Sequence, residues 1–175
     1  SSAASDVYKR QAKDCLGNQT LEFNIHAYDD YDEMIQALQN REIDMIFYAG
    51  RNPYFAEQNG YALTNTAWIY SLMAVTDEEK FDENKVYTVA VPKEKYALKQ
   101  HIAFSYPEWK LVDCDSLDNA ADMVIQEKAD CFLMGASQAL IYDNSQNFKS
   151  IPLTKTMEAC FAVRSGEGTL LSILN

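Results

Sequence analysis

Two segments of the chain repeat one pattern, and this repeat limits most strongly which folds are open to it. The segment "YDEMIQALQNREIDMIFYAG" aligns with "LDNAADMVIQEKADCFLMGA" when Asp44 is placed on Asp130. Each copy has apolar residues at helical intervals, then a charged turn, an aspartate and a short apolar run typical of a buried strand. Two interpretations stay open. Either any helix-to-strand unit converges on this pattern, or the copies belong to two similar lobes, each with its own small sheet. A cleft between such lobes would be the default ligand site.

The rest of the chain continues the alternation of helices and strands. Apolar residues spaced three and four apart predict helices, and short alternating or continuous apolar runs predict strands. The expected helices cover residues 6–16, 29–42, 94–104, 116–129, 137–144 and 168–175. The expected strands cover residues 21–28, 43–50, 86–92, 109–115, 130–135 and 157–166, and residues 61–76 are expected to be extended. This order predicts an α/β protein with parallel-rich sheet structure flanked by helices.

Length, charge and cysteine spacing exclude several classes of protein. At 175 residues the chain can form one domain, or two small lobes, with a substantial core. Its net charge of -11 argues against nucleic acid or an anionic membrane surface as a partner. The four cysteines are far apart and include no C-x-x-C pair, so we expect mostly buried thiols. No stretch reaches the roughly 18 to 20 apolar residues that span a bilayer.

Sequence motifs for catalysis are missing. The two histidines, His26 and His101, fall in different predicted elements. No H-E-x-x-H, G-x-S-x-G or P-loop spacing occurs, and no cysteine has a base paired with it nearby. The acidic residues 29–33 lack the spacing of a calcium-binding loop, so we expect a solvated helix start there. We therefore expect a protein that is not an enzyme and that needs no cofactor.

Five segments, taken in order, resemble the extracellular solute-binding proteins of the amino-acid-binding type, which are type 2 periplasmic binding proteins. The segments are "MIQALQNREIDMIFYAG", "YALTNTAWIYSLMAV", "YTVAVPKEKYA", "AADMVIQEKADCFLMGASQALIY" and "CFAVRSGEGTLLSILN". The resemblance runs from about Asp6 to Asn175. It implies a two-lobed α/β fold, with two small mixed sheets flanked by helices and a hinge between the lobes. Members also serve as sensor domains of bacterial membrane receptors, and they close on their ligand.

The resemblance also implies where the lobes begin and end. Lobe 1 would comprise residues 6–84 plus 156–175, and lobe 2 would comprise residues 85–155. Hinge crossings would lie near residues 84–87 and 153–156. The family's first strand and closing helix are missing from the given sequence, either because they were trimmed from it or because those residues are disordered. If neither holds, lobe 1 would have an unpaired sheet edge that something must cover.

The residues that grip an amino acid in this family are not found at the corresponding positions. Members carry an arginine after the first repeated strand, and its guanidinium matches the ligand's carboxylate in shape and charge. Here that position is Phe55 or Ala56, and Arg51 lies four or five residues earlier. Gly135 stands where the family has an aspartate for the ligand's ammonium group. Residues 92–96 replace the small hydroxyl residues that face the carboxylate, so the resemblance implies the fold without the zwitterion site.

The residues expected to face the cleft are mainly aromatic and cationic. The expected ligand-binding residues are Tyr48, Arg51, Asn52, Trp68, Tyr70, Lys93, Lys95, Tyr96, Gly135 and Ser137. This set suits a flat or apolar ligand with a negative group, so we expect a sugar, an aromatic acid or a peptide rather than free glutamate or histidine. Ordinary packing is the alternative for each aromatic residue, Trp68 and Tyr70 above all. A surface or inter-lobe salt bridge is the alternative for Arg51.

Together these features favour an extracytoplasmic ligand-sensing domain of a bacterial membrane signalling receptor. The protein would lie in the periplasm or at the cell surface, tethered to the membrane in its full-length form. Its partners would be a small molecule and membrane-anchored output domains in the same chain. The alternatives are a solute-binding component that serves an ABC permease, and a structural domain that binds nothing. The preference for a receptor rests on the missing amino-acid clamp, because transport requires tight capture of a specific solute.

Overall fold

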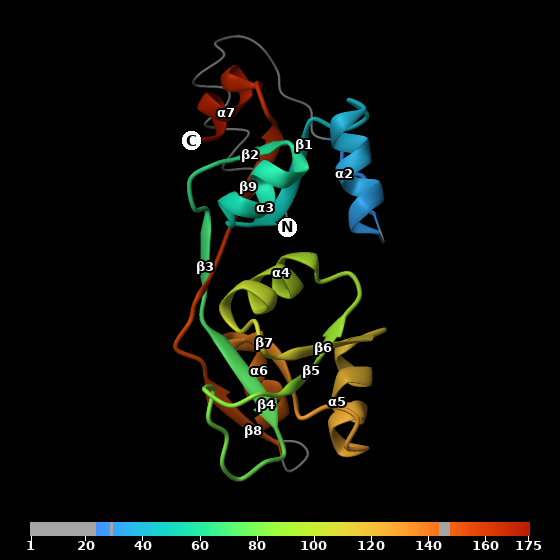
Figure 1. Ribbon diagram of the computed structural model, residues 1–175, viewed down its shortest axis with the longest axis vertical. Helices are drawn as coiled ribbons and strands as arrows, with labels where there is room; N and C mark the ends of the chain where they lie inside the picture. Colours follow the sequence, from blue (N-terminus) through green and yellow to red (C-terminus); the bar gives the residue numbers. More distant parts are fainter. Residues whose placement is uncertain (1–23, 29, 144–147) are drawn as a thin grey trace. The chain divides into compact units, whose positions relative to one another are not determined.

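Figure 1 shows the fold in a computed structural model, which describes residues 24–28, 30–143 and 148–175. The helices are α2 (Tyr31–Gln39), α3 (Pro53–Asn59), α4 (Tyr96–Ser105), α5 (Leu117–Ile125), α6 (Ala136–Asp143) and α7 (Gly168–Leu174). The strands are β1 (Met45–Gly50), β2 (Tyr61–Leu63), β3 (Trp68–Tyr70), β4 (Leu72–Thr76), β5 (Thr88–Pro92), β6 (Lys110–Cys114), β7 (Cys131–Gly135), β8 (Lys149–Pro152) and β9 (Met157–Arg164). The helix predicted over residues 6–16 lies outside the described residues.

The strands form two sheets. The four-stranded sheet has the order β1-β9-β2, and β3 also pairs with β9. The five-stranded sheet has the order β6-β5-β7-β4-β8. In this mixed sheet β5 runs parallel to β6 and β7, whereas β4 runs antiparallel to β7 and β8. Helices flank both sheets (Figure 1). The structure thus confirms the prediction of an α/β fold with two small sheets.

The five-stranded sheet has a hydrophobic core on each face. Cys131 and Leu133 of β7 pack in a cluster with residues of α4, while Phe132 and Met134 pack in a second cluster with residues of α5 and α6. All four side chains are buried. A strand covered on both faces needs apolar residues at every position. This is why β7 reads as an uninterrupted apolar run in the sequence.

Contacts divide the chain into two compact units. Unit 1 comprises residues 1–49, 53–67 and 160–175, and unit 2 comprises residues 50–52 and 68–159. Strand β9 contributes residues to both units, because its first three residues belong to unit 2 and the others to unit 1.

The chain enters unit 2 earlier than the resemblance implied. The expected boundary lay near residue 84, whereas unit 2 begins at Trp68 because β4 is hydrogen-bonded between β7 and β8. The segments 84–87 and 153–156, expected as hinge crossings, both lie inside unit 2. There the Glu83 carboxylate accepts hydrogen bonds from the backbone N–H of Thr154, at 2.8 Å, and from the Thr154 hydroxyl.

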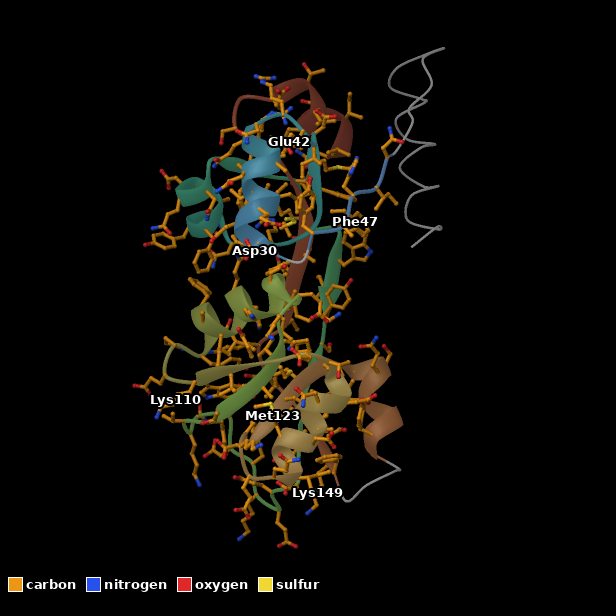
Figure 2. The ribbon with its side chains drawn as sticks, turned by 90° about the vertical axis from the view of Figure 1, so that its right-hand side faces the viewer. Asp30, Glu42, Phe47, Lys110, Met123 and Lys149 are labelled. Carbon is orange, nitrogen blue, oxygen red and sulfur yellow. The ribbon has the colours of Figure 1, made fainter. Side chains whose placement is uncertain are left out.

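The repeated segments adopt matching structures, one in each unit. Asp30 caps α2 by accepting a 3.0 Å hydrogen bond from the third residue of that helix, and Ser116 caps α5 in the same way at 3.1 Å. Figure 2 labels Asp30 and Glu42, which lie at opposite ends of α2, and Met123 on α5. The turns that follow contain Arg41, with φ 63°, and Glu127, with φ 56°. Few L-residues other than asparagine and aspartate adopt this left-handed conformation. The two copies therefore agree even in a strained detail, and each supplies a strand to a separate sheet.

Three local features differ from the sequence prediction. Residues 24–28, expected in a strand, take no regular secondary structure. Helix α3 and strand β8 were not predicted, since each is short and lacks a clear apolar period. Strand β1 was expected to be buried, yet Phe47 remains 53% exposed while its ring lies 5.3 Å from that of Phe161. The expected buried thiols are found at Cys114, Cys131 and Cys160.

Arg164, at the end of β9, ties together the repeat of unit 1. Its guanidinium donates to the carbonyl oxygens of Leu38 at 3.0 Å and Ile43 at 2.6 Å, at the C-terminal end of α2 and in the turn beyond it. It also forms ion pairs with Asp44 and Glu167, at 3.2 and 3.4 Å. The side chain is only 12% exposed. A cation in this position satisfies carbonyl groups that a helix end leaves without partners.

We expect Arg164→Met to lower the free energy of unfolding by about 3 kcal/mol, because it leaves buried carbonyl groups and a carboxylate without their donor. Arg41→Met is the matched control. Arg41 also pairs with Glu167, at 3.4 Å, but its side chain is 73% exposed, so its loss should cost no more than about 0.5 kcal/mol. Urea denaturation of both variants measures the difference. Equal losses would contradict the anchoring role of Arg164.

Candidate functional site

Nine of the ten residues that the sequence proposes for ligand binding belong to unit 2. The exception is Tyr48, which lies on β1 in unit 1. The nine others come from four places: the loop after β1, strand β3, the start of α4 with the loop before it, and the junction of β7 with α6. The elements that carry them are therefore parts of one compact body.

The loop after β1 is attached to unit 2 through its backbone. The N–H of Arg51 donates to the carbonyl of Glu158 in β9 at 3.0 Å, and the N–H of Asn52 donates to the carbonyl of Gly50 at 2.9 Å. Gly50 is buried, and a Cβ atom there would lie 3.5 Å from the carbonyl oxygen of Ala97 in α4. The side chain of Arg51 is exposed and forms no ion pair with any described residue. Hydrogen bonds thus fix the backbone of this loop, while the guanidinium of Arg51 is exposed to solvent.

Two lysines flank the start of α4, and they differ in their surroundings. Lys93 pairs with Asp115 at 2.8 Å, although both side chains are exposed. Through this hydrogen bond and the charge of its partner, the pKa of Lys93 is raised and that of Asp115 is lowered. Lys95 precedes the first helical residue and is exposed, and no side chain caps that end of α4. Of the two, Lys95 has the charge that no described carboxylate balances.

Sequence reasoning missed Asp115, the residue that balances Lys93. The order of the strands and the residues that follow them could have indicated this pair. Strands β5 and β6 are parallel neighbours with Pro92 opposite Cys114. The loops that follow two parallel neighbouring strands meet at the same edge of a sheet. A lysine just after one strand and an aspartate just after the next should therefore have been placed together.

Strand β3 presents Trp68 and Tyr70 on one face and Ile69 on the other. Trp68 lies opposite Ala159 of β9, and Tyr70 lies opposite Met157. Tyr70 is half-buried against the cluster that contains Leu72 and Met157. Part of its surface therefore serves ordinary packing, which was the alternative interpretation. Trp68 is also half-buried.

The junction of β7 with α6 leaves room for a larger group. Gly135 ends β7, and the next residue, Ala136, donates its N–H to the carbonyl of Ser71 at 3.0 Å. A Cβ atom at Gly135 would have no heavy atom within 4 Å. Ser137 is exposed in the first turn of α6, and Tyr96 is half-buried at the start of α4. No carboxylate stands at residue 135 to receive an ammonium group.

Acid–base and metal chemistry have little support in the described part of the chain. Burial, above all, raises the pKa of the Cys131 and Cys114 thiols, so neither is disposed to act as a nucleophile. Residues 24–28, 30–143 and 148–175 contain no cluster of three histidine, cysteine or acidic side chains that could hold a metal ion. None of the described helices has the length and apolar character needed to cross a membrane.

Comparison with solved structures identifies the fold. A double mutant of the BvgS VFT2 domain from Bordetella pertussis superposes with a TM-score of 0.72 at 23% identity, covering 99% of this chain and 75% of that one. The substrate-binding protein of an amino acid ABC transporter gives a TM-score of 0.67 at 16% identity, covering 98% and 77%. The chain has the type 2 periplasmic-binding-protein fold. No protein-family model and no curated protein matches it.

A third protein of this fold is an amino acid-binding protein that preceded an enzyme. The ancestral amino acid-binding protein AncCDT-1, a precursor of cyclohexadienyl dehydratase, gives a TM-score of 0.63 at 18% identity and covers 98% of this chain and 74% of that one. At such identities the periplasmic-binding-protein fold is shared, but binding residues do not transfer between the chains.

The two glycines near the proposed site allow a direct test of its geometry. We expect Gly135→Asp to change the free energy of unfolding by no more than about 0.5 kcal/mol, because the new side chain enters open space. Gly50→Asp should cost about 2 kcal/mol or more, because its carboxylate would be buried against the carbonyl oxygen of Ala97 and the amide oxygen of Gln100. Chemical denaturation of both variants gives the two values. A large loss at Gly135 would show that the space there is filled.

Proposed function

We propose that the chain is an extracytoplasmic ligand-sensing domain of a bacterial membrane signalling receptor and that it binds a small molecule other than a standard amino acid. The exposed guanidinium of Arg51, held on a hydrogen-bonded loop and without an ion pair among the described residues, carries this proposal. A guanidinium so placed can bind a carboxylate or another planar anion through two parallel hydrogen bonds. The fold shared with a BvgS VFT2 domain supports a receptor.

The residues around Arg51 define the class of ligand that we propose. Lys95 adds a second exposed cation, and Tyr96 adds an aromatic ring at the start of α4. At Gly135 no carboxylate of the described residues lies within 4 Å of the position that a Cβ atom would take. An anion with a flat or apolar body satisfies these groups, whereas a zwitterion would lose the hydration of its ammonium group without compensation. The aromatic residues Trp68 and Tyr70 and the polar residues Asn52, Lys93 and Ser137 complete the proposed set in unit 2, and Tyr48 is proposed from unit 1.

Two alternatives keep some support. The shared fold with a transporter's substrate-binding protein favours a solute-binding component that works with an ABC permease. A structural domain without a ligand is the other alternative. Catalysis is not part of the proposal, because burial raises the pKa of the Cys131 and Cys114 thiols. The dehydratase descended from AncCDT-1 is the reason to include turnover in the test.

A thermal-shift screen separates these functions. The panel should contain aromatic and aliphatic carboxylates, sugars, short peptides and the free amino acids, with product analysis of each mixture by mass spectrometry. A ligand at a hundredfold excess over its dissociation constant stabilises the folded state by about 2.7 kcal/mol. A carboxylate without an amino group should give the largest shift. A comparable shift with a free amino acid would contradict the proposed ligand class, and no shift with any compound would favour the structural domain.

Arg51→Ala should weaken binding of the best anion from that screen by at least about 1.5 kcal/mol, because a charge-assisted hydrogen bond is lost. Arg41→Ala serves as the matched control, since it removes an exposed guanidinium from a turn of unit 1 that carries no proposed ligand residue. Isothermal titration calorimetry of the two variants and the parent protein gives the comparison. Unchanged affinity in Arg51→Ala would assign this side chain to the solvated surface.

A further inference from the structure

The C-terminal end of α4 is held by the four residues that connect β8 to β9, residues 153–156, which we call the strap. The ammonium group of Lys155 donates to the carbonyl of Ser105, the last residue of α4, and lies 4.6 Å from the centre of the Tyr106 ring. Thr154 is bound to Glu83 through both its N–H and its hydroxyl. The N–H of Leu153 donates to the carbonyl of Leu72 at 2.9 Å. The strap therefore meets the end of α4 through Lys155, whose ammonium group binds Ser105 and whose backbone lies near His101 and Tyr106.

His101 lies one helical turn before Ser105, next to this cation. Its Nδ1 atom is 3.5 Å from the Ser105 hydroxyl, and its Nε2 atom is buried with no hydrogen-bond partner in the described part of the chain. The charged groups that neighbouring elements bring to the C-terminal half of α4 include Lys155 from the strap, Glu83 from the loop before β5 and Asp113 from β6. Asp113 is bound to Lys99 at 2.7 Å, and Glu83 is bound to Thr154. No carboxylate is thus placed to balance a charge on His101.

We propose that His101 is a proton-sensitive latch for the strap. While the imidazole is neutral, Lys155 can cap α4 and cover Tyr106. When the imidazole takes up a proton, a second positive charge stands beside the ammonium group, and Lys155 releases the helix end. One proton moves from solvent to a ring nitrogen of His101, and no bond between heavy atoms changes. Histidine is the residue suited to this role, because its ordinary pKa lies near 6.5.

The electrostatics around His101 agree with release of the strap on protonation. Burial first, and then the ammonium charge of Lys155, lower the pKa of His101, and the nearby backbone of Lys155 offsets them only in part. The proton is therefore bound more tightly when the strap is released than when it is closed. By linkage, closure is favoured above pH 6.5 and weakens as the pH falls below it.

Release of the strap would also affect β9, the strand that follows it. The strap leads directly into β9, which begins at Met157 and supplies strand residues to both units. A change in the strap's attachment therefore acts on a strand that supplies residues to both units. Proton uptake at His101 is in this way a second input to the domain, separate from any ligand at Arg51.

The test uses hydrogen exchange of backbone amides, read as protection factors so that the intrinsic pH dependence of exchange is removed. For Leu153 and Thr154 we expect protection to fall between pH 7.5 and pH 5.5 by at least threefold. Protonation of one imidazole can lower the protection by at most about tenfold, because at pH 5.5 an imidazole of ordinary pKa has about ten protonated forms for each neutral one. His26→Gln is the matched control, because His26 is the only other histidine and is exposed. This variant should behave like the parent protein.

In His101→Gln the same amides should keep their protection within twofold across this pH range. Lys155→Gln should show reduced protection at both pH values, with no further loss in acid. An NMR titration of the parent protein should give His101 a pKa below the ordinary histidine value of about 6.5, and this measurement tests the proposal if His101→Gln does not fold. An equal acid-induced loss in His101→Gln would overturn the proposal, as would a His101 pKa at or above about 6.5.

Discussion

The contacts of Asp130, which directly precedes β7, fix the position of the second repeated segment in the five-stranded sheet. Asp130 is bound on two sides: its carboxylate accepts from the N–H of Thr88 at 2.6 Å, and its carbonyl accepts from the Thr76 hydroxyl at 2.7 Å. These contacts tie the turn after α5 to strands β5 and β4 at once. Asp44 has the matching place in unit 1, where Arg164 of β9 binds it at 3.2 Å. Polar groups away from solvent need partners, so the two contacts of the half-buried Asp130 favour one position of the helix–turn–strand unit against the five-stranded sheet, whereas the Asp44 side chain is 83% exposed and the buried partner of its pair is Arg164.

The pairing of charged side chains also bears on the proposed site. The chain is acidic, and several of its cations are committed to internal partners. In the described part of unit 1, Arg41 and Arg164 both bind Glu167. In unit 2, Lys93 and Lys99 bind Asp115 and Asp113 at the end of β6. Exposed cations without an ion pair are therefore informative where they stand on a fixed backbone. Arg51 and Lys95 meet this condition, because backbone hydrogen bonds hold the residues that carry them.

Most regular elements could be predicted from the sequence, since their signals are local. The caps Asp30 and Ser116, the helices that follow them and the strands β1 and β7 appear where apolar spacing placed them. Helix α3 was missed because only Ala56 of its seven residues is buried, so no apolar stripe marks it. The segment 24–28 alternates like a strand, but alternation without a partner strand does not form a sheet.

The sequence by itself determined the α/β class and the repeat of helix, turn and strand, because both depend on residue types at short spacings. The tertiary structure alone decided that β4 joins the five-stranded sheet, that Asp115 neutralises Lys93, and that His101 meets Lys155. These contacts join residues 22 or more positions apart in the chain. Such pairings follow from strand order and loop geometry, which local propensities do not encode.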